Sequence, residues 1–500
     1  MTLETLSARH ARYRRNDVAL VFGGRRLTHA ELDARANRAA NALRGLGLGR
    51  GDRVGLLLDN SVELVELYLA AMKSGVVVVP LSPLLRAEGL LNLLLDAGVS
   101  ALVASERLAP EVDAIRPRLA LPGERILAVE SSYRTLTDEA SPEQPPPAGV
   151  ARDDPYDIVY SSGTTGEPKG IVHTHGIREA YGTGFASSFR VHPESVVLHA
   201  GSLVFNGAFV TLMPALYLGC TYVLLPAFDP DVMLDALAVE RATHVIMVPS
   251  QIVALLERDE LDEAHLPHLE MIGSVGAPLL LEHKQELMRR LPGRLYELYG
   301  LTEGLITILD RDDAERKTAS VGVPPPLYEL RIVGSDGADL PPGEVGEIVG
   351  RGPITMPGYH ARPDLTAQVL VDGWIHSGDL GYLDDDGFLY LVDRKKDLVI
   401  SGGVNVYPRD IEEVAIRHPD VLDVAVFGVP DARWGESPVA AVRLRPGATA
   451  GAAEIRDWVN ARVQARYQRV REVVVRDDFP RSVAGKTLRR VIRDEYLEPA

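Results

Sequence analysis

The chain has 500 residues and a formal net charge of −17, from 53 lysines and arginines against 70 aspartates and glutamates. This acidic balance argues against nucleic-acid and anionic-membrane partners, because both need a basic face. With 46% hydrophobic residues, 25% charged residues and one cysteine, Cys220, the sequence predicts a folded cytoplasmic protein without an intramolecular disulfide or a cysteine-rich metal site.

The first predicted elements alternate between helix and strand. Helical periodicity indicates helices over Glu31–Leu46 and Glu63–Ser74, and short apolar runs indicate strands over Arg53–Leu58 and Val76–Pro80. Apolar strands that alternate with helices are typical of a mostly parallel sheet covered on both faces. The first part of the chain is therefore predicted to have an α/β fold.

The segment Ala200–Phe228 carries no charge and is longer than the ~20 residues that cross a bilayer. Prolines, glycines and Asn206 interrupt it, which favours a buried helix over about Gly207–Leu218 and a buried strand over Tyr222–Leu225. No membrane span is expected, and residues 1–17 lack the apolar stretch of a signal peptide.

The character of the sequence changes twice further along the chain. Short strands and Gly/Pro turns between Pro324 and Tyr390 predict a small β-rich unit. After residue 393, βαβ-like segments at Asp410–Arg417, Val421–Gly428 and Val439–Leu444 precede a helix from Ala452. These segments predict a separate C-terminal domain of about 100 residues.

A strand over Asp157–Tyr160 leads into the ten residues Ser161–Gly170, which read SSGTTGEPKG. Glycines let backbone N–H groups approach a phosphate, hydroxyls donate from side chains, and Lys169 adds charge. The loop is no Walker A motif, because Pro168 stands near its end in place of a second Gly-Lys pair; the alternative is a flexible surface turn. His173 and His175 follow it without a third ligand at metal-binding spacing, which favours a core or surface role.

Further motifs follow in a fixed order along the chain. They are Leu27–Leu32, Gly51–Val54, Ser274–Pro278, Tyr299–Glu303, Trp374–Asp379, Asp393–Asp397, Gly402-Gly403 and Pro480–Lys486. With the phosphate loop, they resemble the adenylate-forming (AMP-binding) superfamily of acyl- and aryl-CoA synthetases, peptide-synthetase adenylation domains and luciferases. The resemblance spans about residues 20–490 of the sequence.

The resemblance implies an α/β fold in two domains. Residues 1–393 would form a large N-terminal domain of two helix-covered sheets plus a small β-rich subdomain. Residues 394–500 would form a small, mobile α+β domain hinged near Lys396. Proline at Lys396 is expected to freeze the hinge in one orientation.

The resemblance also implies the reaction and its cofactors. A carboxylate attacks the α-phosphorus of ATP to give an acyl-adenylate and pyrophosphate, and a thiol, here CoA, then takes the acyl group. Mg²⁺ would bind Glu303, since Mg²⁺ prefers oxygen, and Thr302 would bind the α-phosphate. Lys486 would bridge carboxylate and α-phosphate during adenylation, and Gly403 would let the pantetheine arm pass.

The remaining nucleotide contacts implied by the resemblance fall into three groups. The phosphate loop would contribute Ser161, Ser162, Gly163, Thr164, Thr165, Gly166 and Lys169. The adenosine would be bound by Gly276, Ala277, Glu297, Tyr299, Gly300, Asp379 and Arg394, although Glu297 could equally be a plain strand residue. The CoA nucleotide would be bound by Arg86, Trp434, Tyr467, Arg469 and Arg471, the alternative being a packed tryptophan and a solvated basic helix end.

The acid pocket is predicted around Phe205-Asn206. Asparagine carries no negative charge, which disfavours an α-ammonium substrate. Acyl-CoA ligases often have a Phe-His pair at this position of the pocket, and the absence of the histidine here argues against their usual gate. The predicted apolar lining suits a fatty or aromatic acid and comprises Phe205, Asn206, Phe209, Val248, Leu301 and Leu305.

Three functions are compatible with the motifs. The first is a CoA ligase; the second is an adenylating enzyme that passes its acid to a carrier protein or a non-thiol nucleophile; the third is a non-catalytic nucleotide-binding scaffold. Retention of Lys169, Glu303, Asp379, Arg394 and Lys486 argues against the scaffold, because a non-catalytic relative has no chemical need for all five.

Overall fold

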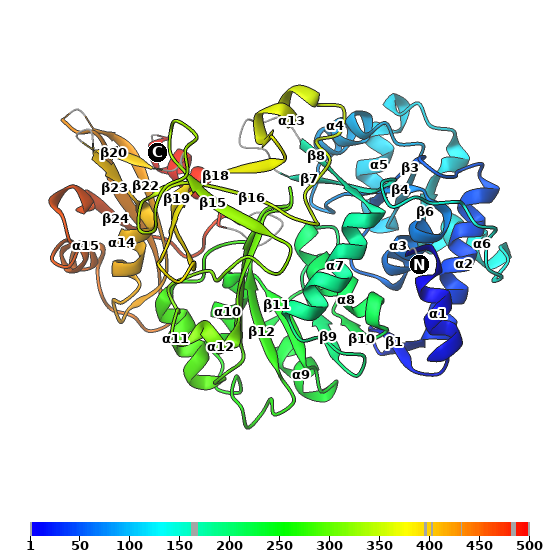
Figure 1. Ribbon diagram of the computed structural model, residues 1–500, viewed down its shortest axis with the longest axis horizontal. Helices are drawn as coiled ribbons and strands as arrows, with labels where there is room; N and C mark the ends of the chain where they lie inside the picture. Colours follow the sequence, from blue (N-terminus) through cyan, green and yellow to red (C-terminus); the bar gives the residue numbers. More distant parts are fainter. Residues whose placement is uncertain are drawn as a thin grey trace.

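The computed structural model describes residues 3–161, 169–394, 398–401, 404–431, 433–481 and 487–498 (Figure 1). Within these residues the strands form four sheets, which we name A to D. Sheets A and B are helix-covered, sheet C is small and antiparallel, and sheet D belongs to the C-terminal part of the chain.

Sheet B has six strands in the order β6-β5-β3-β4-β7-β8. Its strands are β3 (Arg53–Leu57), β4 (Val77–Pro80), β5 (Ala101–Ala104), β6 (Ile126–Ala128), β7 (Pro155–Ser161) and β8 (Lys169–Thr174). All neighbours run parallel except the antiparallel pair β7 and β8. These two strands flank residues 162–168, so the predicted phosphate loop begins and ends at one edge of the sheet.

Sheet A has eight strands in the order β14-β13-β12-β11-β9-β10-β1-β2. They are β1 (Val18–Phe22), β2 (Arg25–Thr28), β9 (Val196–His199), β10 (Thr221–Leu224), β11 (His244–Met247), β12 (Met271–Val275), β13 (Leu295–Gly300) and β14 (Ile306–Leu309). Strands β1 and β9 to β13 are parallel, and β2 and β14 are antiparallel edges. The parallel strands are short and apolar because both faces of the sheet are covered.

Helices fill the space between sheets A and B and cover their outer faces. One continuous apolar core contains residues of both sheets and of α2 (His29–Gly45), α3 (Val62–Ser74), α7 (His175–Ser188) and α8 (Asn206–Leu218). A second core joins sheet A to α9 (Pro230–Val239), α10 (Pro249–Leu256) and α11 (Leu281–Arg290). A third joins sheet B to α4 (Ala87–Ala97) and α5 (Ala109–Ile115). The short helices α1 (Leu6–Tyr13) and α6 (Arg134–Glu139) pack against α2.

The uncharged segment 200–228 folds as predicted, into the buried helix α8 and strand β10. Helix α8 ends at Gly219, whose φ of +74° is the left-handed conformation that favours glycine at a helix end. In the described residues, no helix is both long and apolar enough to traverse a lipid bilayer.

Sheet C confirms the predicted β-rich unit. Its antiparallel strands are β15 (Glu329–Val333), β16 (Gly346–Arg351), β17 (Leu370–Val371), β18 (Trp374–Leu383) and β19 (Leu389–Arg394), and helix α13 (Pro363–Val369) precedes β17. Asp379 on β18 lies opposite Arg394 on β19 in the register of this sheet.

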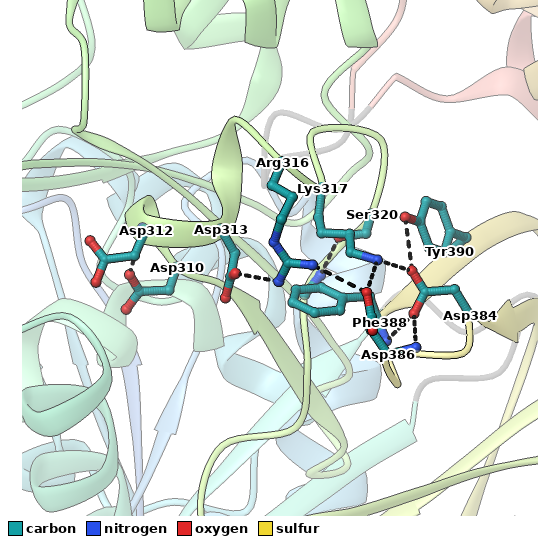
Figure 2. Close-up of polar contacts among 11 residues, drawn as sticks. Asp310, Asp312, Asp313, Arg316, Lys317, Ser320, Asp384, Asp386, Phe388 and Tyr390 are labelled. Atoms are coloured by element: carbon teal, nitrogen blue, oxygen red, sulfur yellow. Dashed lines mark hydrogen bonds and ion pairs between the residues drawn. The ribbon is translucent and has the colours of Figure 1, made fainter.

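A cluster of ion pairs fastens sheet C to the segment after α12 (Arg311–Ala314), as Figure 2 shows. Lys317 Nζ lies 2.6 Å from an oxygen of Asp384 and 2.7 Å from one of Asp386, in the turn between β18 and β19. The Arg316 guanidinium lies 3.2 Å from Asp386, and both cations lie over the Phe388 ring. Because this segment follows β14, the contacts hold the edge of sheet A against sheet C.

The C-terminal sheet D contains β20 (Val399–Ser401), β21 (Val404–Val406), β22 (Val421–Asp431), β23 (Gly435–Leu444) and β24 (Glu472–Val475). Its faces are covered by α14 (Pro408–Ala415), α15 (Ala452–Asn460) and α16 (Arg489–Leu497). The predicted βαβ pattern is correct only for β23-α15-β24, because β22 and β23 form an antiparallel hairpin.

The C-terminal part contacts the large domain at α11. Leu280 belongs to the apolar core of sheet D, and Glu413 on α14 accepts a hydrogen bond from the Leu281 backbone N–H. The chain passes from sheet C to sheet D between Arg394 and Val399. The domain boundary after residue 393 and the hinge at Lys396, which lies outside the described residues, stay predictions.

Candidate active site

The β7–β8 hairpin positions the predicted phosphate loop. Ser161 and Lys169 are paired across the hairpin, so the loop opens from adjacent strand ends. Ser162, Gly163, Thr164, Thr165 and Gly166 lie outside the described residues, as does the side chain of Ser161. The Lys169 side chain is half-buried, and its ammonium lies 5.4 Å from the centre of the Tyr359 ring.

Tyr359 connects this lysine to the predicted magnesium ligand. Its hydroxyl donates a hydrogen bond of 2.8 Å to Oε1 of Glu303, and burial together with the Glu303 charge raises the pKa of Tyr359. The backbone of Glu303 is fixed by a bond from the Met356 N–H to its carbonyl. Gly304 has a φ of +117°, and a Cβ there would lie 2.1 Å from the Ile354 carbonyl oxygen, so glycine is required.

Two predicted adenosine ligands from different sheets contact each other. The Tyr299 hydroxyl, from β13 of sheet A, donates a 2.9 Å hydrogen bond to Oδ2 of Asp379, from β18 of sheet C. Asp379 is 8% exposed. The contact brings the ribose and adenine positions expected from the sequence to one place, where the two sheets meet.

The other adenosine residues leave sheet A at the same edge. Strands β12 and β13 are parallel and in register at Val275 and Leu298, so Gly276-Ala277 and Tyr299-Gly300 emerge side by side. Gly276 has a φ of +92°, and a Cβ on Gly300 would lie 2.5 Å from a backbone oxygen. Glycine therefore suits the left-handed backbone conformation of residue 276, and at residue 300 it allows close backbone packing at the end of the sheet.

The position of Glu297 does not support its predicted contact with the adenine amine. This residue is buried, and its carboxylate pairs with the buried ammonium of Lys284 on α11. Lys284 also donates to the carbonyl oxygens of Thr318 and Ser320. Glu297 thus fixes α11 and the segment after α12 to strand β13, because a buried carboxylate needs a cationic partner.

A buried polar network lies beneath Thr302. The carbonyl of Thr302 lies 2.9 Å from His173 Nε2, and His173 Nδ1 lies 2.8 Å from Oδ1 of Asp157. The second oxygen of Asp157 accepts a 2.7 Å hydrogen bond from Arg178, which also donates to Asn206. Of the core or surface role predicted for His173, the structure shows the core role, and Arg178 is a buried cation that the motifs did not indicate.

The predicted acid-pocket residues separate into two groups. Phe205, Asn206, Val248 and Leu301 are half-buried and lie at the ends of α8, α10 and β13. Phe209 and Leu305 are at most 1% exposed and belong to apolar cores, and the Arg178 guanidinium covers the Phe209 ring at 3.8 Å. Because both side chains are buried in these cores, their positions do not support a direct contact with the acid.

The predicted CoA residues lie on two different domains. Trp434 and Tyr467 are 42% and 44% exposed on the C-terminal domain, and Arg433 lies over the Trp434 ring. Arg469 and Arg471 follow Tyr467 and lead into β24. Arg86 precedes α4 of the large domain, where it pairs with Glu111 at 3.3 Å.

Comparison with known proteins decides the family. The family model for AMP-binding enzymes matches residues 7–360, and the model for the AMP-binding enzyme C-terminal domain matches residues 410–486. The chain belongs to the AMP-binding enzyme family. A feruloyl-CoA synthase of Amycolatopsis sp is 36% identical over 98% of both chains. The fatty acid–acyl-carrier-protein ligase ScoC of Streptomyces coeruleorubidus is 32% identical over 99% of this chain and 96% of its own.

Solved structures of the AMP-binding family have the same fold. ATP-bound MatB from Rhodopseudomonas palustris superposes with a TM-score of 0.90 at 31% identity, covering 99% of each chain. The predicted resemblance, the α/β fold class and the enzyme class are thereby confirmed. The chain is an AMP-forming acid–thiol ligase, an enzyme class that activates a carboxylic acid as its adenylate and transfers the acyl group to a thiol.

Several of the predicted site residues lie outside the described part of the chain. They are Lys486, Gly403 and the hinge residue Lys396, with the side chain of Arg394. The described residues on either side of Lys486, which are Arg481 and Thr487, form a β-bridge. Arg489 follows it and pairs with Glu412 at 2.7 Å and with Asp393 at 3.7 Å.

Proposed function

We propose that this enzyme converts an aromatic or fatty carboxylic acid to its CoA thioester, with formation of AMP and pyrophosphate. One observation carries the proposal: Lys169, Tyr359 and Glu303 converge at one side of the site, and Tyr299 contacts Asp379 at the other. A cation, a carboxylate and a ribose acceptor arranged in this order match the phosphates, the metal and the ribose of one ATP molecule.

In the proposed adenylation step, Lys169 binds the β- and γ-phosphates together with the loop from Ser161 to Gly166. Asp379 accepts hydrogen bonds from the ribose hydroxyls, for which a carboxylate has two oxygens. The Thr302 hydroxyl holds the α-phosphate, and Lys486 neutralises the charge that develops as carboxylate oxygen bonds to phosphorus and pyrophosphate leaves. Both reactants are anions, so positioning and charge neutralisation are the main tasks of the protein.

The donor set at Glu303 fits a magnesium ion. The carboxylate is half-buried, one of its oxygens accepts from Tyr359, and Mg²⁺ is usually held by one or two carboxylates together with substrate phosphates. The described residues contain no group of three or more His, Cys, Asp or Glu side chains arranged for a metal. Bound Mg²⁺ would neutralise phosphate charge.

The acid and thiol sites rest on the pocket and the C-terminal domain. Phe205, Val248 and Leu301 supply apolar surface, and the half-buried Asn206 supplies no charge for an ammonium group. The exposed rings of Trp434 and Tyr467, with Arg86, Arg469 and Arg471, suit the adenine and phosphates of CoA. Rotation of the C-terminal domain at Lys396 would exchange Lys486 for Gly403 between the two half-reactions.

ATP–pyrophosphate exchange tests the first half of the proposal. Ferulate, 4-coumarate, benzoate, octanoate and palmitate are each supplied with ATP and Mg²⁺, and coniferyl alcohol, which has no carboxylate, is the matched control. Exchange with at least one acid, followed by thioester formation on addition of CoA, is expected. Absence of exchange with every acid would contradict the assignment.

A carrier protein is the second candidate acceptor, and the similarity to ScoC supports it. The test offers the preformed adenylate to CoA, to a phosphopantetheinylated acyl carrier protein and to the same carrier without its arm. Faster transfer to the carrier than to CoA would favour this candidate.

A further inference from the structure

Arg178 is completely buried in α7, yet it contacts both the acid pocket and the network beneath Thr302. Its Nε donates a 2.7 Å hydrogen bond to Asp157 Oδ2, and its Nη1 donates a 2.9 Å hydrogen bond to Asn206 Oδ1. Burial alone would raise the pKa of Asp157, but the contacts with Arg178 and His173 together outweigh burial, and the pKa lies below its usual value. The two residues therefore form a charged pair in the core.

The other end of the network reaches the nucleotide loop. A carbonyl oxygen can only accept, so His173 Nε2 carries a proton and donates it to the Thr302 carbonyl at 2.9 Å. His173 Nδ1 lies 2.8 Å from Asp157 and 3.1 Å from Arg178, so the ring contacts both members of the charged pair. Asp157 and His173 lie on β7 and β8, the strands that carry the phosphate loop.

Asn206 is fixed at both ends of its amide group. Its Oδ1 accepts from Arg178, and its Nδ2 donates a 2.9 Å hydrogen bond to the Tyr181 hydroxyl. Rotation of this side chain would leave the buried polar groups of Arg178 and Tyr181 unsatisfied, which is strongly unfavourable. Residue 206 is therefore a stationary part of the pocket wall, and the pocket has no gate at this position.

We infer that Arg178 is a positioning residue that couples the two substrate sites. Through Asn206 on one side and Asp157, His173 and the Thr302 carbonyl on the other, it fixes the acid pocket relative to the loop that binds the α-phosphate. The inference rests on the proposed function, because it assigns these two ends to acid and ATP. Apolar residues of similar volume often give equal stability in such a buried space, so we assign to the polar network the relative orientation of its five segments: β7, β8, α7, α8 and the segment after β13 that contains Thr302.

The test is the affinity of the full-length enzyme for ATP and Mg²⁺ without any acid, measured by isothermal titration calorimetry. Asn206→Ala changes only the end of the network at the acid pocket, and His173→Asn changes the end at the nucleotide loop. The two single variants and the double variant are compared. Glu179→Gln is the control, since it lies on the same helix and removes only a surface ion pair with Arg152. Thermal unfolding checks the fold of each variant.

We expect Asn206→Ala to weaken ATP binding by about threefold to tenfold, although the residue does not touch ATP. The double variant should bind ATP about as weakly as His173→Asn alone, because that substitution already interrupts the hydrogen-bond network between Asn206 and the Thr302 carbonyl. The control Glu179→Gln should bind ATP like wild type. Arg178→Met should weaken ATP binding by about tenfold or more; if it does not fold, the other variants decide the question.

Two results would overturn the inference: folded Asn206→Ala that binds ATP as tightly as wild type, or losses that simply add in the double variant. Wild-type enzyme that binds no ATP would instead count against the proposed function, so the two failures are distinct.

Discussion

The Tyr359 hydroxyl donates a 2.8 Å hydrogen bond to Glu303 Oε1, while the same ring lies 5.4 Å from the Lys169 ammonium. One tyrosine thus contacts both the predicted magnesium ligand and the predicted phosphate ligand. A hydrogen bond to a charged group contributes about 1.5–3 kcal/mol. Tyr359 is therefore expected to orient Glu303 before ATP and Mg²⁺ bind.

Tyr359→Phe should keep the ring beside Lys169 and lose the bond to Glu303. We expect kcat/KM for ATP in pyrophosphate exchange to fall by about tenfold, with the midpoint for Mg²⁺ shifted to higher concentration. Tyr382→Phe is the matched control, because its ring stacks on Tyr390 in sheet C and the substitution also removes one hydroxyl. Equal activity of the two variants would argue against an orienting role for Tyr359.

Local patterns in the sequence predicted much of the fold. The helix α8 and strand β10 follow from an apolar run with Gly219 at its break, and strand β7 was expected over Asp157–Tyr160 from its apolar pattern. The phosphate loop that follows β7 stays a prediction. The βαβ-like arrangement expected for β22 and β23 was wrong, because the two strands form an antiparallel hairpin. An apolar strand has the same sequence pattern whether its neighbour runs parallel or antiparallel.

Contacts between distant segments were not predictable in the same way. Tyr359 and Glu303 are 56 residues apart, and Arg178 reaches Asn206 across 28 residues. Glu297 precedes Tyr299 by two positions, which suggests a shared role on one strand face, but only the packing of α11 reveals Lys284 as its partner. A buried ion pair depends on tertiary packing, and the local sequence pattern does not contain it.

Lys486→Ala separates the two half-reactions. If Lys486 stabilises the charge that develops during adenylation, its loss should lower the rate of pyrophosphate exchange by about 100–1000-fold. Conversion of a supplied acyl-adenylate and CoA to the thioester should continue at close to the wild-type rate. The measurement compares exchange with single-turnover thioester formation on the same preparation, and an equal loss in both assays would contradict the assignment.

Lys284 and Glu297 provide a test of stability at the base of the nucleotide site. Their side chains are 1% and 3% exposed, so Lys284→Met leaves a buried carboxylate without its cation and should destabilise the fold by about 3–5 kcal/mol. The double variant Lys284→Met/Glu297→Leu removes both charges and should recover most of this loss. Thermal unfolding measures both effects.

The same double variant also tests the role of Glu297 in nucleotide binding. If Glu297 acts only through Lys284, the affinity of the double variant for ATP should stay within about threefold of wild type. A much larger loss of ATP affinity in a stable double variant would restore the contact with adenine that the sequence predicted.

Glu66 on α3 predicts a dependence of stability on pH. It is 2% exposed, accepts a 2.7 Å hydrogen bond from Tyr133 and lies 2.8 Å from Arg35, yet burial outweighs these partners and raises its pKa from 4.5 to about 7. Between these pH values the folded chain keeps a proton that the unfolded chain has released. The free energy of unfolding should therefore fall by about 3 kcal/mol as the pH rises through this window.

Glu66→Gln keeps an acceptor for Tyr133 and removes the titration, so its advantage in melting temperature over wild type should grow from pH 5 to pH 8. Tyr133→Phe should widen the pH range over which stability falls, whereas Glu66→Gln removes that fall. The Tyr133 hydroxyl stabilises the charged carboxylate, so without it the pKa of Glu66 rises further. The decrease in stability of this variant should then extend to higher pH. Melting curves recorded at each pH unit from 5 to 9 measure these shifts, and parallel curves for wild type and Glu66→Gln would show that Glu66 does not titrate in this range.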